Sequence, residues 1–306
     1  MGKTIITPDQ HKIEIKKAKV WTTPQIILTI VILIFSLACL LPFVNVAAVS
    51  FSSKSAILRG KVTFWPVEFE TTAYKAIFAD SSMIRSLVLT IIMTIVYTAI
   101  SMAMTILMAY PLTKKRLHGR KFFSLMALFT MYFSGGIIPH YLNIRDLGLM
   151  DNVWSLILPC MLSTYYMIIL KSFFQSLPNE LEEAAIIDGA TDFQVLWRIY
   201  LPLSMASLAT LTLFYAVYRW NGFQDALYYI NTKSKQPLQL KLYNIIKGAQ
   251  AVDVAAMEGG SSTVATSVSE SIRPATIIFA TMPILVVYPF VQRYFVAGVT
   301  IGAVKG

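Results

Sequence analysis

Six long stretches of the chain contain no charged residue, and polar or charged segments separate them. They run over residues 20–53, 86–113, 122–144, 152–170, 199–218 and 274–292. Each reaches the roughly 18-residue minimum of a membrane-spanning helix. Inside hydrocarbon every backbone N–H and C=O must be paired within the protein, and barrel strands alternate apolar with polar residues, so runs this continuous favour helices. The sequence therefore predicts an all-α membrane protein with six transmembrane helices.

Composition argues against a soluble helical bundle with an unusually apolar core. Hydrophobic residues make up 56% of the 306 residues and charged residues only 14%, whereas soluble domains carry about 25% charged residues. The two cysteines, Cys39 and Cys160, both lie inside apolar stretches. They are expected to pack as small hydrophobic residues rather than to form a disulfide or a metal site.

The net charge of +10 would suggest nucleic acid binding in a soluble protein, but here membrane topology explains it and no nucleic acid partner is expected. Basic residues gather before the first apolar stretch and after the second: Lys3, Lys12, Lys16, Lys17 and Lys19, then Lys114, Lys115, Arg116, Arg120 and Lys121. With six helices both groups lie on one side, which the positive-inside rule makes cytoplasmic. We therefore expect a multi-pass protein of the bacterial cytoplasmic membrane with both termini cytoplasmic. The first apolar run is too long for a signal-peptide core and lacks a cleavage site, so it is expected to span the membrane.

The spacing of these stretches divides the chain into four parts. A cytoplasmic tail (1–20) precedes the first transmembrane helix with its external loop (21–79), which includes a small surface helix. A five-helix core (80–298) follows, and a cytoplasmic tail (299–306) comes last. In the core, Ser134, Gly135, Gly136 and Pro139 predict a kink near the outer end of the third helix. A long external segment (221–272) contains a stretch with helical spacing at 238–249.

The segment 178–202 is the most informative part of the chain. Asn179 is a candidate N-cap after a proline, and the acidic residues at 180, 182 and 183 fall in the first helical turn, where the helix dipole favours negative charge. Gly189 ends this helix, and Asp192 can start a second short helix that continues toward Pro202. The segment is expected to form a short helix across the membrane surface with a bend on each side.

This segment resembles the EAA signature of the membrane subunits of ATP-binding-cassette (ABC) importers. It contains Glu183-Ala184-Ala185, three residues, Gly189, nine residues, then Ile199, Leu201 and Pro202. The resemblance covers roughly residues 80–306 and implies the MetI-like type I importer permease fold. The stretches 133–136, 292–295 and 302–306 are similar to the carbohydrate-uptake branch, in particular to permeases for complex oligosaccharides or polysaccharide fragments.

The resemblance also implies a role for the loop. In such importers the EAA helix couples the permease to the ATPase by seating in a groove of the ATP-hydrolysing subunit. Carried over by position, the coupling residues are Glu183, Ala184, Ala185, Asp188, Gly189, Arg198, Leu201 and Pro202, with Asp188 and Arg198 as polar partners at the edges. The segment 302–306 is expected to touch the ATPases as well. The implied partners are a second homologous permease in a heterodimer, a dimer of ABC ATPases and an extracytoplasmic solute-binding protein.

The chain is not expected to be an enzyme itself. It contains no Gly-x-x-x-x-Gly-Lys-Ser/Thr phosphate loop, so it cannot hold ATP phosphates by that device. We expect ATP and Mg²⁺ on the partner ATPase, and neither a cofactor nor a metal on this chain.

Sugars are held by aromatic faces and polar side chains in enclosed cavities. The candidates for the substrate path are Tyr132, Ser134, Tyr165, Tyr166, Tyr215, Trp220 and Asn221, with Tyr141, Tyr218 and His140 as further positions. The alternative is that tyrosine and tryptophan collect at membrane interfaces regardless of any ligand. The segment 221–272 is the candidate contact for the solute-binding protein, with 259–263 reaching toward its ligand cleft.

Three alternatives to an oligosaccharide importer differ in what supports them. A secondary transporter is disfavoured because no charged residue lies in the central part of any predicted helix. A permease of the same kind for an amino acid, peptide, polyamine or phosphate stays open, because the coupling loop reports the motor and not the cargo. A non-transporting scaffold or sensor has no positive support.

Overall fold

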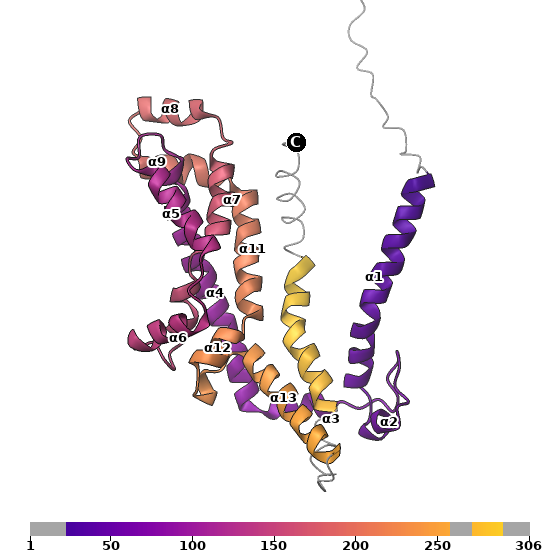
Figure 1. Ribbon diagram of the computed structural model, residues 1–306. Coiled ribbons are helices and arrows are strands. Elements are labelled where there is room, and N and C mark those ends of the chain that lie inside the picture. The colour runs from indigo at the N-terminus through magenta and orange to yellow at the C-terminus, as the bar shows by residue number, and fades with distance from the viewer. Residues whose placement is uncertain (1–22, 258–270, 290–306) are drawn as a thin grey trace, which may run out of the picture.

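The computed structural model describes residues 23–257 and 271–289 (Figure 1). Within these ranges the regular structure is helical, apart from an isolated β-bridge between Ser52 and Phe69. The tails expected at 1–20 and 299–306 lie outside the described residues. So do the stretch 259–263 and the C-terminal positions that contributed to the family resemblance.

The described part of the chain contains six spans, as the sequence predicts, when each bent pair of helices counts as one. Three spans are continuous: α1 (Thr23–Ser50), α4 (Ser81–Ala109) extended by η1 (Pro111–Thr113), and the helix Ser271–Pro289. The others are bent: α5 (Arg120–Tyr132) with α6 (Ile137–Asp146) by 113°, Val153–Cys160 with α7 (Thr164–Phe174) by 46°, and Asp192–Leu203 with α11 (Met205–Asn221) by 83°.

The sharpest of these bends is the predicted kink of the third helix. Phe133 is extended at the end of α5, and Gly136 has a φ of +88° just before α6. Side-chain-bearing residues rarely adopt that φ, so a glycine is needed there. The other two bends were not predicted. At the 83° bend, a π-helical turn, η4 (Leu196–Tyr200), leads into α10 (Leu201–Leu203), and Ser204 separates α10 from α11. Pro202 lacks the backbone N–H that a regular helix uses.

Several short helices and one 20-residue helix lie at the two ends of the molecule (Figure 1). One end carries α8 (Asn179–Ile187) and α9 (Asp192–Val195). The opposite end carries α2 (Lys54–Leu58), α3 (Thr72–Ala79), α12 (Gln224–Tyr229), η5 (Lys233–Lys235) and α13 (Leu238–Met257). The segment 52–80 therefore holds two helices where one was expected. The segments expected to be external lie at the end opposite the 178–202 loop.

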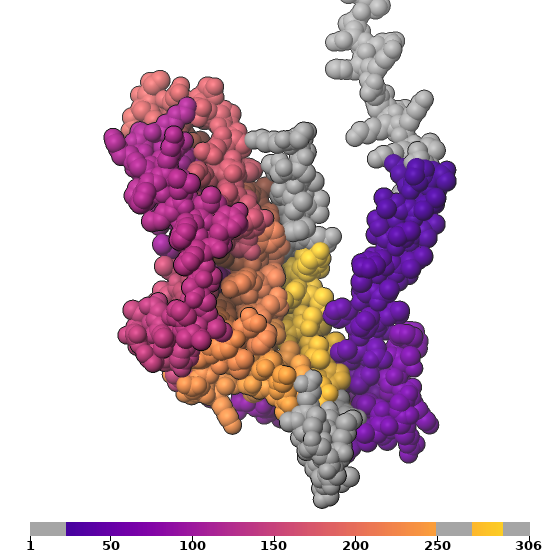
Figure 2. Space-filling model, viewed as in Figure 1, coloured from indigo at the N-terminus to yellow at the C-terminus, as the bar shows by residue number. Residues whose placement is uncertain are grey.

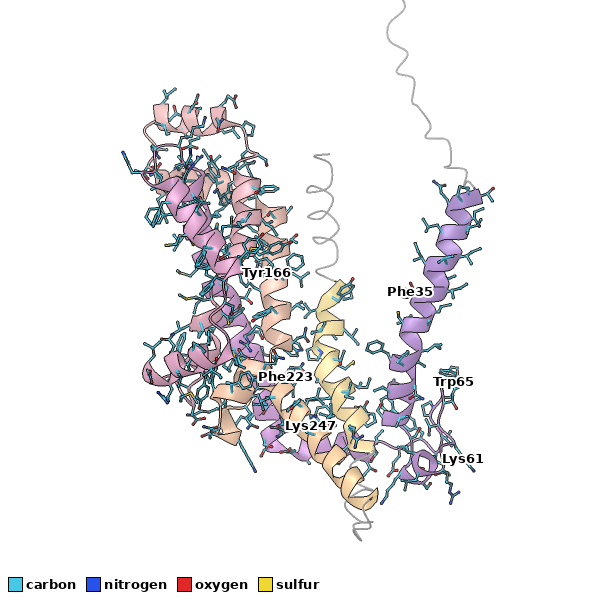
Figure 3. The ribbon with its side chains drawn as sticks, viewed as in Figure 1. Phe35, Lys61, Trp65, Tyr166, Phe223 and Lys247 are labelled. Carbon is cyan, nitrogen blue, oxygen red and sulfur yellow. The ribbon has the colours of Figure 1, made fainter. Side chains whose placement is uncertain are left out.

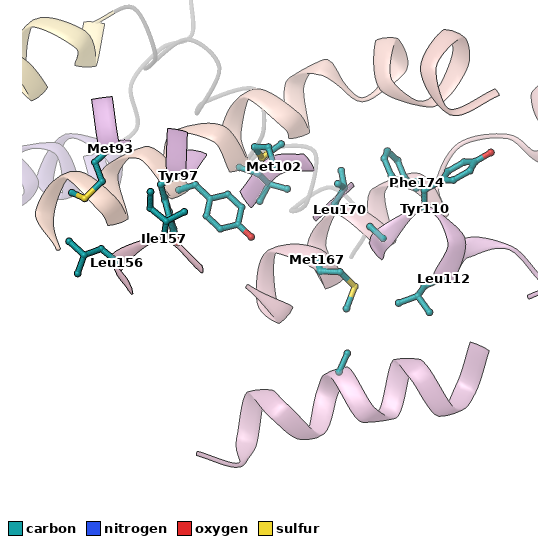
Figure 4. Packing of buried hydrophobic residues seen from close by; sticks show 14 of the residues in the cluster. Met93, Tyr97, Met102, Tyr110, Leu112, Leu156, Ile157, Met167, Leu170 and Phe174 are labelled. Atoms are coloured by element: carbon teal, nitrogen blue, oxygen red, sulfur yellow. The ribbon is translucent and has the colours of Figure 1, made fainter. Parts of the chain in front are cut away.

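The core is built around α4, which packs against α7, α11 and α13. Ser86, Thr90, Ser101 and Thr105 are buried on α4, and small residues let transmembrane helices approach closely. Larger apolar side chains, among them Met93 and Leu170, fill the remaining space (Figure 4). The backbone N–H of Leu238, at the start of α13, donates to the buried Thr90 Oγ1 at 2.8 Å. The start of the helix predicted at 238–249 is therefore anchored to the core, where Leu238 and Leu240 are buried.

The helix α1 stands apart from the other spans over most of its length (Figure 2). None of its most apolar 18-residue window is buried, and Phe35 is 71% exposed (Figure 3). Its side chains pack mainly near its end, where Ala48 and Ser50 are buried. The apolar surface of α1 is left for lipid or another chain to cover.

Candidate functional site

The loop 178–202 forms the predicted helix, bend and second helix. Asn179 is the first residue of α8 rather than its N-cap, and Glu180 and Glu182 occupy the first turn. Gly189 follows α8 with a φ of +79°, a backbone conformation that favours glycine. Thr191 and Gln194 then form a capping box at the start of α9, where each side chain accepts a backbone N–H from the other residue.

The coupling residues predicted from the sequence divide by exposure. The side chains of Glu183, Ala184, Asp188, Arg198 and Pro202 are exposed, as is the backbone at Gly189. Ala185 and Leu201 are partly buried against the main core. Within the described residues neither Asp188 nor Arg198 forms an ion pair. Both side chains therefore point to surroundings outside the core.

Three exposed apolar side chains lie along the same loop, on α8, on α9 and on η4. Ile187 is 85% exposed, Phe193 66% and Trp197 64%, and the rings of Phe193 and Trp197 stack with centroids 6.3 Å apart. Aromatic residues that stay exposed at a polar end of a protein are typical of an interaction surface. We call Ile187, Phe193 and Trp197 the α8–α9 apolar surface.

Glu182 is a residue of this loop that sequence reasoning did not single out. Its Oε2 accepts hydrogen bonds from Lys114 Nζ at 2.6 Å and from the Tyr200 hydroxyl at 2.7 Å. Burial raises the pKa of Glu182, but these two bonds and the positive charges of Lys114 and Arg116 together lower it more, so its pKa lies below the ordinary 4.5. We call Lys114, Glu182, Tyr110 and Tyr200 the Lys114 clamp. The basic run at 114–116 and the acidic residues at 180–183 were a sequence signal for this clamp. From the sequence alone, however, membrane topology and the helix dipole were enough to explain those charges.

A cleft of about 620 Å³ lies at the other end of the core, between the α5–α6 break, the end of α11 and α12. Of the predicted substrate-path residues, Ser134 and Asn221 line this cleft, and His140 and Tyr218 join them. His140 Nδ1 lies 2.8 Å from the Tyr229 hydroxyl. The cleft thus combines aromatic rings with amide, hydroxyl and imidazole groups.

The other predicted substrate-path residues lie elsewhere. Tyr132 and Tyr165 are exposed outside the cleft. Tyr166, which Figure 3 labels, packs against Tyr215 with ring centroids 4.8 Å apart. The Tyr215 hydroxyl is 2.7 Å from Thr105 Oγ1. Trp220 is buried in a second apolar cluster. Tyr166, Tyr215 and Trp220 therefore serve helix packing in this conformation.

Arg219 borders the cleft and was also missed, because the charge-free stretch ends one residue before it. Its side chain is fully buried and donates two hydrogen bonds to the carboxylate of Asp225, at 2.5 and 2.9 Å. A third bond goes to the carbonyl oxygen of Leu156 at 2.7 Å. Arg219 therefore ties the end of α11 to α12 and to the turn that precedes α7.

The described part of the chain holds no group of three or more His, Cys, Asp or Glu residues that could bind a metal ion. Cys39 and Cys160 are both free.

Comparisons with known proteins agree with this arrangement. Residues 122–268 match the family described as binding-protein-dependent transport system inner membrane component. The polygalacturonan/rhamnogalacturonan transport system permease protein YtcP of Bacillus subtilis (strain 168) is 40% identical over 278 residues, which cover 90% of this chain and 96% of that protein. Protein LplC of the same organism is 43% identical over 267 residues, covering 87% and 90%. The crystal structure of a bacterial ABC transporter involved in the import of the acidic polysaccharide alginate matches with a TM-score of 0.81 and 33% identity, over 91% of this chain and 100% of that one.

A bundle of bent membrane helices with a helical loop projecting from one end is the architecture of an importer permease. The chain belongs to the binding-protein-dependent transport system inner membrane component family. It is the permease subunit of an ABC importer, with the MetI-like type I fold, in the bacterial inner membrane. It is not an enzyme, since a separate ATPase hydrolyses ATP in these importers.

Proposed function

We propose that this permease carries fragments of an acidic polysaccharide into the cell. The observation that carries this proposal is the similarity to two transporters whose names state their cargo, polygalacturonan/rhamnogalacturonan and alginate. Polygalacturonan is a polymer of a uronic acid, and alginate is an acidic polysaccharide by that description. Both relatives match about nine tenths of this chain, so the similarity includes the cleft as well as the coupling loop.

The cleft is suited to an anionic sugar chain that must be released again. The buried Arg219 at the cleft is neutralised by Asp225, so its charge is not free to trap a polyanion. Asn221, Gln224 and Tyr228 line the cleft and offer neutral polar groups for hydroxyls and carboxylates. A transport path needs binding that is favourable enough to enter and weak enough to leave.

We further infer how the subunit is assembled. The α8–α9 apolar surface seats on an ABC ATPase, which binds ATP and Mg²⁺. Glu183, Ala184 and Gly189, which are exposed beside it, contribute to the same contact. A second, homologous permease completes the path, and an extracytoplasmic solute-binding protein delivers the cargo to the α12–α13 end. In this arrangement both termini are cytoplasmic.

The cargo is tested with the complete importer in lipid: this chain, its second permease, the ATPases and the binding protein. Saccharide-stimulated ATP hydrolysis and uptake are measured with oligogalacturonates and alginate oligomers, and with the methyl esters of the same oligogalacturonates as a matched uncharged control. We expect at least one acidic oligosaccharide to stimulate ATP hydrolysis about ten times more than its methyl ester does, a difference equivalent to about 1.4 kcal/mol. Equal stimulation by acid and ester, or stimulation only by a neutral sugar, amino acid, peptide or polyamine, would contradict the proposal.

A further inference from the structure

Helix ends from four elements of the core meet around Lys114, which follows η1 and is 8% exposed. Its Nζ lies 4.1 Å from the ring centroid of Tyr110 and 4.3 Å from that of Tyr200. These two rings are 5.1 Å apart at 79°, and Phe174, at the end of α7, packs edge-on against both. Tyr110 and Phe174 lie together in Figure 4. An ammonium group against ring faces is a favourable cation–π arrangement.

This aromatic box holds the coupling helix through one carboxylate. The helix α8 has no fully buried residue, although Ala185 packs partly against the core. Glu182 accepts one hydrogen bond from the α4 side, through Lys114, and one from the α11 side, through Tyr200. In addition, the Tyr110 hydroxyl donates to the carbonyl oxygen of Asp192, at the start of α9, at 3.0 Å. Both short helices of the loop are thus tied to one point.

Stability alone does not account for such a buried pair. Well-packed apolar residues of similar size stabilise a fold as well as a buried ion pair does, or better. The neighbouring pair of Arg116 with Asp192 is exposed on both sides, and exposed pairs contribute little. What the clamp adds is a fixed geometry, because the carboxylate can satisfy Lys114 and Tyr200 together only in one position of α8.

We infer that Lys114 is a positioning residue that fixes the coupling helix α8 to α4 and α11 together, so that a displacement of α8 by the ATPase moves both helices. The inference rests on the proposed coupling role of α8. Loss of the clamp leaves the α8–α9 apolar surface intact but lets α8 move independently of the core.

The test uses the complete importer in lipid with Lys114→Met, Lys114→Arg and, as a matched control, Lys115→Met at the exposed neighbouring lysine. Hydrogen exchange of residues 179–190 is measured without nucleotide or saccharide, and saccharide-stimulated ATP hydrolysis is measured separately. We expect Lys114→Met to retain the ATPase on purification, to speed exchange about tenfold and to reduce stimulation about tenfold. Lys114→Arg, which keeps a cation in the box, and Lys115→Met should resemble the wild type.

A charge swap separates the clamp from a simple ion pair. The double variant Lys114→Glu/Glu182→Lys should not restore stimulation, because the ring faces of Tyr110 and Tyr200 disfavour a carboxylate at position 114. If Lys114→Met does not fold, Glu182→Gln keeps the shape and removes the charge, with the same expectation. Wild-type exchange or wild-type stimulation in the variant that folds would overturn the inference, and so would rescue by the swap. A wild-type importer that no acidic saccharide stimulates would refute the proposed cargo, and the exchange measurement would still decide whether Lys114 positions α8.

Discussion

At the scale of single residues, the buried Arg219 leaves no room for a side chain at the neighbouring Gly222. A Cβ at position 222 would lie 2.5 Å from Arg219 Nη2 and 3.1 Å from its Cζ. The guanidinium cannot move aside, because Asp225 and the Leu156 carbonyl hold it. We expect Gly222→Ala to lower the free energy of unfolding by about 1–3 kcal/mol, measured by thermal unfolding of the purified protein in lipid.

A control for this substitution lies in α13. A Cβ at Gly248 meets no atom within 4 Å, and alanine is better than glycine inside a helix by about 0.5–1 kcal/mol. Gly248→Ala should therefore leave the unfolding temperature unchanged or raise it slightly. Equal effects of the two substitutions would contradict the close contact at Gly222.

A second residue-scale prediction concerns pH. Asp151 accepts hydrogen bonds from the Thr232 hydroxyl and the backbone N–H groups of Asn231 and Thr232, and it pairs with Lys235. These interactions, with the Thr232 bonds foremost, hold the pKa of Asp151 well below its ordinary 3.8. A lowered carboxyl pKa gives stability that is complete above the ordinary pKa and is lost only as the pH falls through the lowered one.

Acidification from about pH 7 to about pH 5 should therefore leave the exchange protection of the Asn231 and Thr232 amides unchanged, once intrinsic exchange is corrected for pH. Asp151→Asn tolerates the φ of +55° at this position but loses the negative charge. It should weaken that protection at both pH values. Protection lost already near pH 5 in the wild type would show that the carboxylate is not held as described.

At the scale of elements, the sequence predicted the spans better than their internal breaks. The length of a charge-free run shows whether a segment is long enough to cross the membrane. A glycine pair followed by a proline marks the break at 135–139. The bend at Ser204 has a weaker signal, because a single Pro202 is compatible with a straight helix start. The helix, bend and second helix of the 178–202 loop were predicted from local residues, since its caps and glycine act locally. The Lys114 clamp depends on residues about 70 positions apart that only packing brings together, so the spacing could not show it.

The α5–α6 break gives a prediction at this scale, with two adjacent glycines as a matched pair. Gly136 has φ +88° and ψ 174°, a region that essentially only glycine adopts. A Cβ at Gly135 would meet only Pro139 Cβ at 3.9 Å, an ordinary contact. We expect Gly136→Ala to cost about 1–3 kcal/mol and to lower the yield of folded protein, whereas Gly135→Ala should be tolerated. Comparable thermal unfolding of the two variants would show that Gly136 does not set the bend.

At the scale of the whole molecule, the two ends carry different features. One end has α8 and α9, and the opposite end has α12 and α13 (Figure 1). The Lys114 clamp and the α8–α9 apolar surface belong to the first end, and the cleft belongs to the second. The separation follows from the fold, because an even number of spans lies between the basic segment after α4 and the 178–202 loop. The sequence could predict this polarity from charge. It could not predict that α1 stands apart, because the sequence of an apolar helix does not show whether the helix packs against lipid, its own core or a partner.

The orientation of the two ends is testable by labelling single cysteines, since both native ones can first be replaced by serine. Ser55→Cys in α2 and Ser234→Cys in η5 lie at the cleft end, and Ser176→Cys lies at the α8 end; all three positions are exposed. Because positively charged loops stay in the cytoplasm, we expect a membrane-impermeant maleimide to label the first two in intact cells. It should label Ser176→Cys only in inverted vesicles.

Ser55→Cys also tests the orientation of α1. Ser55 lies on the same side of the membrane as the cleft end only if α1 crosses from a cytoplasmic N-terminal segment to the outside. If Ser55→Cys and Ser234→Cys differ in labelling, α1 does not cross in that sense. If Ser176→Cys is labelled from outside, the coupling end faces away from the ATPases, and the proposed docking of α8 is wrong.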